Sequence, residues 1–351
     1  MQSGKSTIFS AISGKKIPPP GSASIEEAIV SVPDERIEWL AEFYKPKKTT
    51  YATIDCLDVP GFNFTDEHGR SAARRLINQI RTVDALVLVI RAFENPDIPP
   101  YRNRIKPEKD LEELKTELLL ADLELVTTRV EKLQKQLNKP TKTQAQDKAE
   151  LALQTKLQET IEAEKPISSA IENDKEREMI KSLNFLTLKP IVVVVNIGED
   201  RLQAPRQQSD LSNLIEDGTP LINLCAKLEY ELAQLDRQSR EEFMKDLGIK
   251  ESAVSKFVAS CYSALGLISF FTPVSDELRA WPIKKGTSAL DAAGKIHTDI
   301  KRGFIRAETF SFDDLKELGD EKQLKAAGKI RLEGKDYVVQ DGDVIRFRFN
   351  V

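Results

Sequence analysis

The chain has 351 residues, of which 40% are hydrophobic and 31% charged, and its formal net charge is −4. This length accommodates two or three domains, and the small net charge does not indicate a general polyanion binder, so any contact with nucleic acid must use a local basic patch. Three cysteines without a CxxC spacing and only two histidines argue against a disulfide framework or a zinc site and favour a reducing cytoplasm. The longest aliphatic runs are far shorter than a membrane span.

The first hundred residues alternate predicted helices and strands. Helical spacing is found at residues 5–12 and 71–81, and strand-like runs are found at 28–32, 51–59 and 85–90. The run ALVLVI at 85–90 is apolar without interruption, and such strands between helices are typical of a parallel sheet covered on both faces. This alternation predicts an α/β domain.

Residues 107–185 have a different pattern. Apolar residues recur every three to five positions among charged residues, on both sides of the polar segment 138–146. This spacing predicts two long amphipathic helices joined by a turn that contains Pro140, that is, an antiparallel helical hairpin. Two interpretations remain open, a packed subdomain without a specific role and a projecting arm that binds a partner.

The α/β pattern then resumes, so the hairpin is an insertion within one domain. Residues 191–195 and 221–224 are predicted strands, and residues 209–216 are a predicted helix. A smaller, strand-rich unit begins at about residue 275, with strands expected at 281–283, 307–312, 337–339 and 344–349 and helices at 288–296 and 324–327. This mixture of strands with two short helices predicts a β-grasp fold.

The chain opens within a phosphate-binding signature. Gly4, Lys5 and Ser6, followed by Thr7, match the end of G-x-x-x-x-G-K-[ST]. In that motif backbone N–H groups cradle phosphates, the lysine reaches the β- and γ-phosphates, and the hydroxyl binds Mg²⁺. The first glycine and the strand before it would precede Met1, so we expect that the recorded chain begins inside the motif.

Three further sequence elements follow in the order that a P-loop GTPase-type domain requires. DVPG at 58–61 supplies Asp58 for Mg²⁺, usually through water, and the Gly61 N–H for the γ-phosphate. NIGE at 196–199 and CAK at 225–227 follow two predicted strands and occupy the places of the N-K-x-D and S-A-K loops that bind the base. The predicted base-loop residues are Asn196, Ile197, Glu199, Ala226 and Lys227. Each element has a plain structural alternative, such as a turn, a cap or a solvated charge. Their order, at the ends of strands where α/β sheets bind ligands, favours a nucleotide site.

The base loop departs from the pattern that selects guanine. An aspartate in the last position pairs bidentately with guanine, whereas Glu199 is longer by one methylene, and Ile197 replaces the lysine that packs along the base. The spacing therefore makes guanine preference doubtful without proving adenine preference.

Several stretches spread along the chain point to one family: residues 196–199, CAKLE at 225–229, AW at 280–281 and three C-terminal stretches, 296–308, 326–343 and the closing FRFNV. In these stretches the chain resembles the Obg-like ATPase (YchF) family of TRAFAC P-loop GTPase-like proteins, and the resemblance extends over essentially its whole length. It implies a P-loop G domain at 1–104 and 188–274 that lacks the first strand and the first P-loop glycine. It also implies an α-helical coiled-coil insertion at 105–187 and a C-terminal TGS (β-grasp) domain at 275–351. The resemblance further implies binding of ATP in preference to GTP, dependence on Mg²⁺, and association with the ribosome.

The residues expected to move water or protons differ from what hydrolysis requires. Phe62 follows Gly61 where other GTPases have the glutamine that orients water, and the family itself has a hydrophobic residue there. A histidine that the family often carries is replaced by Pro100, which has no proton to transfer. His68 is a weak substitute, because a surface loop histidine explains it better. Three functions remain open: a slow ATPase switch, a nucleotide-binding ribosome or RNA adaptor that does not hydrolyse, and a GTPase with an unusual base site.

The predicted TGS domain contains the candidate contacts to RNA. Five basic residues are suited to phosphate-backbone contacts, and an ordinary solvated surface is the alternative: Lys284, Lys285, Lys301, Arg302 and Arg306. The family resemblance favours RNA or the large ribosomal subunit as the partner. We expect neither a membrane partner nor sequence-specific DNA binding.

Overall fold

The computed structural model describes residues 2–19, 22, 24–61, 67–138, 143–202, 210–249, 251–274 and 276–350. The chain divides into two compact units. The first unit comprises Met1–Ile8, Ile17–Ile25 and Val59–Leu228, and the second comprises Phe9–Lys16, Glu26–Asp58 and Glu229–Val351. Two helices run across these boundaries, α1 (Lys5–Ser13) and α7 (Ala226–Gln234).

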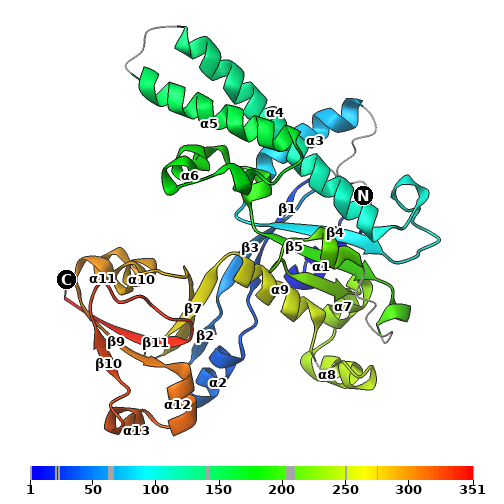
Figure 1. The fold of residues 1–351 in the computed structure, drawn as a ribbon. Helices are drawn as coiled ribbons and strands as arrows, with labels where there is room; N and C mark the ends of the chain where they lie inside the picture. Colours follow the sequence, from blue (N-terminus) through cyan, green and yellow to red (C-terminus); the bar gives the residue numbers. More distant parts are fainter. Residues whose placement is uncertain are drawn as a thin grey trace. The chain divides into compact units, whose positions relative to one another are not determined.

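The first unit contains a parallel sheet of β4 (Leu86–Ala92), β5 (Ile191–Ile197) and β6 (Leu221–Leu224), in that order (Figure 1). The four consecutive valines of the central strand are 0–3% exposed, because a parallel strand in an α/β fold is covered on both faces. Leu111 and Leu118 of α4 (Pro107–Leu137) pack on this sheet with α3 (Glu67–Ile80). The α/β prediction for these strands is confirmed.

Helices α4 and α5 (Gln144–Glu162) pack against each other along their lengths (Figure 1). Arg129 on α4 binds Glu150 on α5 through two hydrogen bonds of 2.6 and 2.9 Å, and Gln136 Nε2 donates to Asp147 Oδ2 at 3.0 Å. The later partner on α4 meets the earlier partner on α5, so the two helices are antiparallel. Pro140, expected in their connection, lies outside the described residues.

A buried carboxylate ties α4 to two other segments of the first unit. Asp122 is fully buried and accepts hydrogen bonds from Arg81 Nη1 at 2.7 Å, from the Leu186 and Thr187 N–H groups at 3.1 and 2.9 Å, and from the Thr187 hydroxyl at 2.9 Å. Because Arg81 directly follows α3, this one side chain links α3, α4 and the segment that leads into β5.

A buried polar side chain of α5 has no hydrogen-bond partner among the described residues. Gln154 is fully buried, and neither its amide nitrogen nor its oxygen is bonded in the described part of the chain. Burying an unsatisfied amide costs about 1–3 kcal/mol. We therefore expect Gln154→Leu to raise the free energy of unfolding by about that amount, measured by urea denaturation. Gln158→Leu, one turn later, is the matched control, because Gln158 is half-buried and its amide donates to Glu162 at 3.0 Å; an equal gain in both variants would contradict this explanation.

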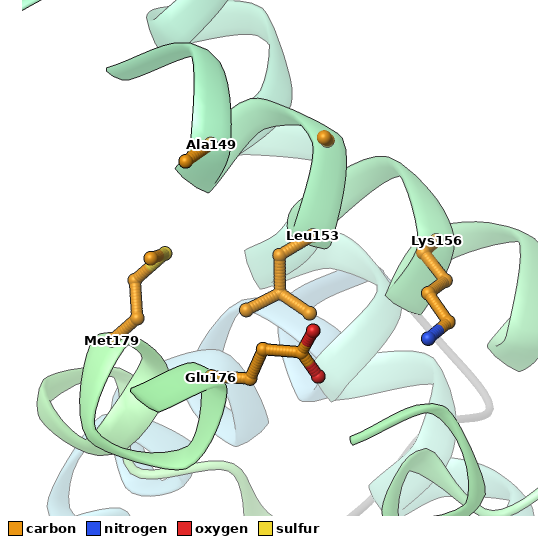
Figure 2. A pocket seen from close by; sticks show the side chains of 6 residues that line it. Ala149, Leu153, Lys156, Glu176 and Met179 are labelled. Atoms are coloured by element: carbon orange, nitrogen blue, oxygen red, sulfur yellow. The ribbon is translucent and has the colours of Figure 1, made fainter. Parts of the chain in front are cut away.

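A pocket of about 240 Å³ opens between α5 and α6 (Asp174–Ile180) (Figure 2). Leu153 forms part of its apolar lining, and the charged side chains of Lys156 and Glu176 also border it. None of the residues that line this pocket belongs to the predicted nucleotide site, so we do not assign the nucleotide to it.

The remaining described elements of the first unit are short. They are the 3₁₀ helices η1 (Tyr101–Asn103), η2 (Ile167–Ala170), η3 (Lys181–Leu183), η4 (Leu186–Leu188), η5 (Glu199–Arg201) and η6 (Asp210–Leu214). The helix predicted at 209–216 is found as η6, and Ser209 lies outside the described residues.

The second unit contains a mixed sheet of six strands in the order β10-β9-β11-β7-β8-β2. Their bounds are β10 Arg331–Glu333, β9 Phe304–Ser311, β11 Asp343–Phe349, β7 Leu267–Val274, β8 Glu277–Lys284 and β2 Lys48–Thr50. The pairs β11–β7 and β2–β8 are parallel and the others are antiparallel. The predicted strand at 337–339 is only an isolated bridge between Ser288 and Val338.

Helices α10 (Ala289–Ile296) and α11 (Thr298–Arg302) cover one face of this sheet, where Phe270, Ala307 and Ile345 are fully buried. The other helices of the second unit are α2 (Glu35–Tyr44), α8 (Arg237–Asp246), α9 (Ala253–Ala264), α12 (Phe312–Leu318) and α13 (Glu321–Ala326). Strands β1 (Glu26–Ser31) and β3 (Thr53–Asp58) pair antiparallel. This pairing differs from the parallel arrangement expected there, and the alternating burial of β1 fits it better.

Helix α2 was not predicted, and two polar contacts fix it to the C-terminal part of the second unit. Arg36 Nη1 binds Asp341 at 2.9 Å, and the Tyr44 hydroxyl donates to Glu321 at 2.5 Å. Burial and the adjacent Glu321 carboxylate raise the pKa of Tyr44. Within the described ranges, no helix has the length and apolarity needed to cross a membrane.

Candidate functional site

The phosphate-binding signature forms the N-terminus of a helix. Helix α1 begins at Lys5, directly after Gly4, and its first intrahelical bond runs from the Ile8 N–H to the Gly4 carbonyl at 3.0 Å. The N–H groups of the first turn therefore have no intrahelical acceptor, which is the arrangement that binds phosphate. Ser6 and Thr7 are half-buried within this turn.

Gly4 is required by its conformation and by its neighbour. Its φ of +90° is strained for a residue with a side chain, and a Cβ built on it would lie 2.2 Å from Asn196 Nδ2. We expect Gly4→Ala to displace the loop, lowering stability by about 1–3 kcal/mol and nucleotide affinity by about tenfold or more. The measurements are thermal unfolding and titration with ATP.

Gly14→Ala is the matched control for this prediction. Gly14 also has a positive φ, of +69°, but no described atom lies within 4 Å of a Cβ built there. It should therefore carry the conformational cost without the change in affinity. Equal losses of affinity in both variants would show that the contact of Gly4 with Asn196 is unimportant.

Asn196 joins two of the predicted loops through its side chain. It is 4% exposed, its Nδ2 donates to the Ser3 carbonyl at 2.9 Å, and its Oδ1 accepts the Ala226 N–H at 2.9 Å. Asn196 was predicted as a residue of the base loop, and in the structure both of its polar atoms bind protein backbone. The amide therefore fixes the start of α1 and the start of α7 against the end of β5.

The charged residues of the two base loops are also brought together. Lys227 Nζ lies 2.9 Å from Glu199 Oε1, in an ion pair whose side chains are 71% and 53% exposed. Such an exposed pair contributes only about 0–1 kcal/mol to stability. It matters because it joins the two predicted base loops. Ile197 is half-buried and Ala226 is buried. Burial also raises the pKa of the adjacent Cys225 thiol, which stays neutral near pH 7.

Asp58 is the last residue of β3 and is 8% exposed. Its carboxylate makes no side-chain hydrogen bond or ion pair with any described residue. A buried carboxylate without a partner among the described residues suits a cation ligand, since burying an unpaired charge is costly. Gly61 is half-buried. Phe62 and the side chain of His68 lie outside what the structure describes.

Two residues that sequence reasoning missed lie beside the base loop. Arg91, on β4, is 4% exposed, and its guanidinium donates to the carbonyls of Phe93 and Ile98 at 3.1 and 2.9 Å. A Cβ built on Gly198 would lie 3.8 Å from Phe93 Cβ, so Gly198 lies next to the start of the Phe93 side chain. The signal in the sequence was a charged residue within an otherwise apolar strand. Burial lowers the pKa of Arg91, although a guanidinium remains protonated near pH 7.

The basic residues predicted to contact RNA do not form one surface. Lys301 binds Asp291 at 2.8 Å and Arg302 binds Asp299 at 3.0 Å, and both lysine and arginine are on α11. Arg306 lies in β9 next to Ala307, which faces α10 and α11, so Arg306 projects from the opposite face. There it is the register partner of Arg348, a residue that the sequence did not single out.

The two other predicted basic residues lie at the end of β8. Lys284 donates to the Leu265 carbonyl at 2.7 Å, and Lys285 is exposed. Within the described residues, no three His, Cys, Asp or Glu side chains are grouped so as to hold a metal ion.

Comparison with known proteins gives relatives that match the whole chain. It is 40% identical over 359 residues to the ribosome-binding ATPase YchF of Bacillus subtilis (strain 168), covering 99% of this chain and 96% of the relative. It is 36% identical over 356 residues to Obg-like ATPase 1 of Oryza sativa subsp. japonica, covering 99% of this chain and 90% of the relative. A family model named YchF-GTPase_C, described as a protein of unknown function (DUF933), matches residues 267–350.

Solved structures agree with this similarity. The YchF GTPase of Schizosaccharomyces pombe superposes with a TM-score of 0.84 at 33% identity, over 98% of this chain and 94% of the other. A GTP binding protein from Pyrococcus horikoshii OT3 has a TM-score of 0.58 at 18% identity and shows similarity of fold alone. Identity above 30% over nearly the whole chain, together with this fold, establishes that the chain belongs to the YchF family.

Proposed function

We propose that the chain is a nucleotide-dependent switch that binds Mg²⁺-ATP in preference to GTP, hydrolyses it slowly, and acts with the ribosome. One observation supports this most strongly: Asn196 bonds both Ser3 and Ala226, so three motifs that are far apart in the sequence meet at one place. Relatives at 36–40% identity are named ribosome-binding ATPases.

The start of α1 binds the phosphates. The first-turn N–H groups and Lys5 contact the phosphate oxygens, and Gly4 allows the backbone to approach them closely. Thr7 belongs to the same turn and Gly61 supplies an N–H for the γ-phosphate.

The base loop favours adenine because the carboxylate of Glu199 is engaged in an ion pair. Glu199 is already paired with Lys227, and guanine would require this carboxylate to leave the ion pair and accept two N–H groups. Adenine has no such requirement. Ile197, half-buried beside the loop, offers an apolar contact to the base, and Asn196 and Ala226 hold the loops in place.

Ser6 and Asp58 would hold Mg²⁺, since hydroxyl and carboxylate oxygens are the ligands that this ion prefers. When bound, the ion neutralises charge on the β- and γ-phosphates. The buried carboxylate of Asp58, without a partner among the described residues, fits this assignment.

Hydrolysis is slow because the chain has few groups that can activate water. Phe62 cannot orient water and Pro100 cannot transfer a proton, which leaves His68 as the weak candidate. We expect single-turnover assays to give slow ATP hydrolysis that Lys5→Ala abolishes. A complete absence of turnover, with ATP still bound, would instead support the adaptor without hydrolysis, and tighter binding of GTP would support the GTPase.

The helical insertion and the C-terminal domain are the parts that would contact the ribosome. We propose that residues 105–187, which contain α4 and α5, are a helical arm inserted into a G domain of residues 1–104 and 188–274. Residues 275–351 form a TGS domain, and β7, just before that boundary, lies in the same sheet. These two modules would contact RNA or protein of the large ribosomal subunit.

Co-sedimentation with ribosomes can separate the two basic surfaces of this domain. Arg306→Glu with Arg348→Glu alters the sheet face opposite α11, whereas Lys301→Glu with Arg302→Glu alters α11. We expect the first pair to weaken binding more, because Arg306 has no carboxylate partner among the described residues, whereas Lys301 and Arg302 are both paired with aspartates and Arg348 is paired with Glu308. Binding by the unmodified chain should weaken as the salt concentration rises. Unchanged sedimentation of both variants would remove these residues from the interface.

A further inference from the structure

Strand β1 has one edge without a hydrogen-bonding neighbour in the described part of the chain, where it pairs only with β3. The pairing continues just past the strand, and there the Val32 N–H bonds the Ala52 carbonyl at 2.8 Å. In an antiparallel ladder, hydrogen-bonded pairs alternate with pairs whose backbone groups point away from each other. Counting back from Val32, the backbone N–H and C=O groups of Glu27, Ile29 and Ser31 point away from β3 and toward the open edge.

A side-chain contact agrees with this count. The Glu27 carbonyl accepts a hydrogen bond from Lys15 Nζ at 2.5 Å and is therefore directed away from β3. The backbone groups of Ile29 and Ser31 have no partner among the described residues. Proteins often protect such an edge with a proline or a bulge, but β1 contains no proline and its register with β3 is unbroken. The edge at Ile29 and Ser31 can therefore accept another strand.

The face of β1 and β3 beside this edge is apolar at its centre and acidic around it. The register places Ile29 opposite Asp55 and Leu57 opposite Glu27, so these four side chains share one face of the two-stranded sheet. Ile29 is 72% exposed and Leu57 is 38% exposed. Neither of the two carboxylates makes a side-chain hydrogen bond or ion pair with a described residue.

We propose that the edge of β1 docks an extended segment of a partner protein, with an apolar side chain opposite Ile29 and lysine or arginine side chains that reach Glu27 and Asp55. Backbone hydrogen bonds to the edge supply affinity, and the side chains on the shared face supply specificity. Lys15 does not provide the missing positive charge, because it pairs at 3.9 Å with Glu26, whose side chain lies on the other face.

The charges of this face disfavour two other occupants. RNA would bring phosphates toward Glu27 and Asp55, and a second copy of β1 would bring further carboxylates instead of cations. The proposal uses none of the residues assigned to the nucleotide, so it goes beyond the proposed function and does not depend on it.

A short peptide tests the proposal on the full chain. The probe is fluorescently labelled acetyl-Thr-Lys-Thr-Val-Thr-Lys-Thr-amide, whose valine and lysines lie on one face when the peptide is extended. The control peptide has glutamate in place of both lysines. We expect fluorescence anisotropy to show saturable binding of the lysine peptide and an affinity at least about tenfold lower for the glutamate peptide. The bound lysine peptide should also slow hydrogen exchange at the Ile29 and Ser31 amides.

Two substitutions locate the binding site. Ile29→Lys removes the apolar centre and adds a positive charge, and Ser31→Pro removes an outward N–H that does not pair with β3. We expect each to weaken binding of the lysine peptide by about tenfold or more. If Ser31→Pro fails to fold, Ile29→Lys alone decides.

Val274→Lys is the matched control. Val274 is 61% exposed and lies opposite Glu277, but its strand β7 has β11 on one side and β8 on the other. This variant adds the same charge to an exposed strand position away from β1. Its affinity for the lysine peptide should stay within about twofold of that of the unmodified chain.

Four results would overturn the proposal. They are no saturable binding of the lysine peptide, equal affinities for the two peptides, unchanged binding in the Ile29 and Ser31 variants, or a different occupant of the edge. A dimer in analytical ultracentrifugation that Ile29→Lys dissociates would assign the edge to a second copy of the chain. Binding of oligouridylate that Ser31→Pro abolishes would assign it to RNA. Each of these results would leave the proposed nucleotide site as it stands, because that site is tested separately with ATP and GTP.

Discussion

Replacing Asn196 by alanine is expected to lower the free energy of unfolding by about 2–4 kcal/mol and to weaken nucleotide binding by about tenfold or more. The substitution leaves the Ser3 carbonyl and the Ala226 N–H without their partner, and Ser3 and Ala226 are both buried. Affinity should fall as well, because the loops proposed to hold the phosphate and the base are no longer fixed to β5. Chemical denaturation and titration with ATP measure the two effects.

Asn223→Ala is the control for that result. Asn223 is also a strand asparagine, on the adjacent β6, but its side chain is exposed. Its loss should change stability by no more than about 0.5 kcal/mol and leave affinity as it was. If Asn196→Ala behaved like this control, the amide would not be what holds the three motifs together.

The second large effect is expected at Asp122, where alanine should cost about 3–5 kcal/mol. The substitution removes four hydrogen bonds at once and leaves the Arg81 guanidinium facing a site with no carboxylate. Asp122→Asn keeps the shape and part of the bonding, so it should fall between alanine and the unmodified chain. Urea denaturation at constant pH measures the series.

Glu124→Ala provides the comparison for Asp122, since Glu124 is on the same helix and pairs with Arg74 at 3.3 Å at the surface. An exposed pair of this kind contributes about 0–1 kcal/mol. Similar losses at Asp122 and Glu124 would contradict the role assigned to the buried network.

The strands that carry the proposed site could be predicted because their sequences are unusually apolar. Uninterrupted apolar runs identify β4 and β5, and the polar residues at their ends identify the edge of the sheet where we propose the nucleotide site. Family membership was also readable, from long C-terminal stretches. Helix α2 had a local signal that was missed: Asp34 caps its first turn, and Ile37 and Leu40 are buried one turn apart.

What the sequence could not provide are contacts between distant residues. Nothing local indicates that Asn196 binds Ser3, 193 positions away, or that the Cβ of Phe93 lies close to Gly198. The basic residues of the C-terminal domain illustrate the same limit. Lys301, Arg302 and Arg306 are close in sequence, but strand alternation places Arg306 on the face opposite α11.

The most direct test of the account is titration of the full chain with ATP and GTP in the presence of Mg²⁺, repeated with Lys5→Ala and with Lys16→Ala. Lys5 opens α1 at the proposed phosphate site, whereas Lys16 is an exposed lysine beyond the end of that helix. The account predicts one site per chain, tighter binding of ATP than of GTP, and a loss of about tenfold or more for both nucleotides in Lys5→Ala alone. No saturable binding, or equal affinities of the Lys5 and Lys16 variants, would contradict it.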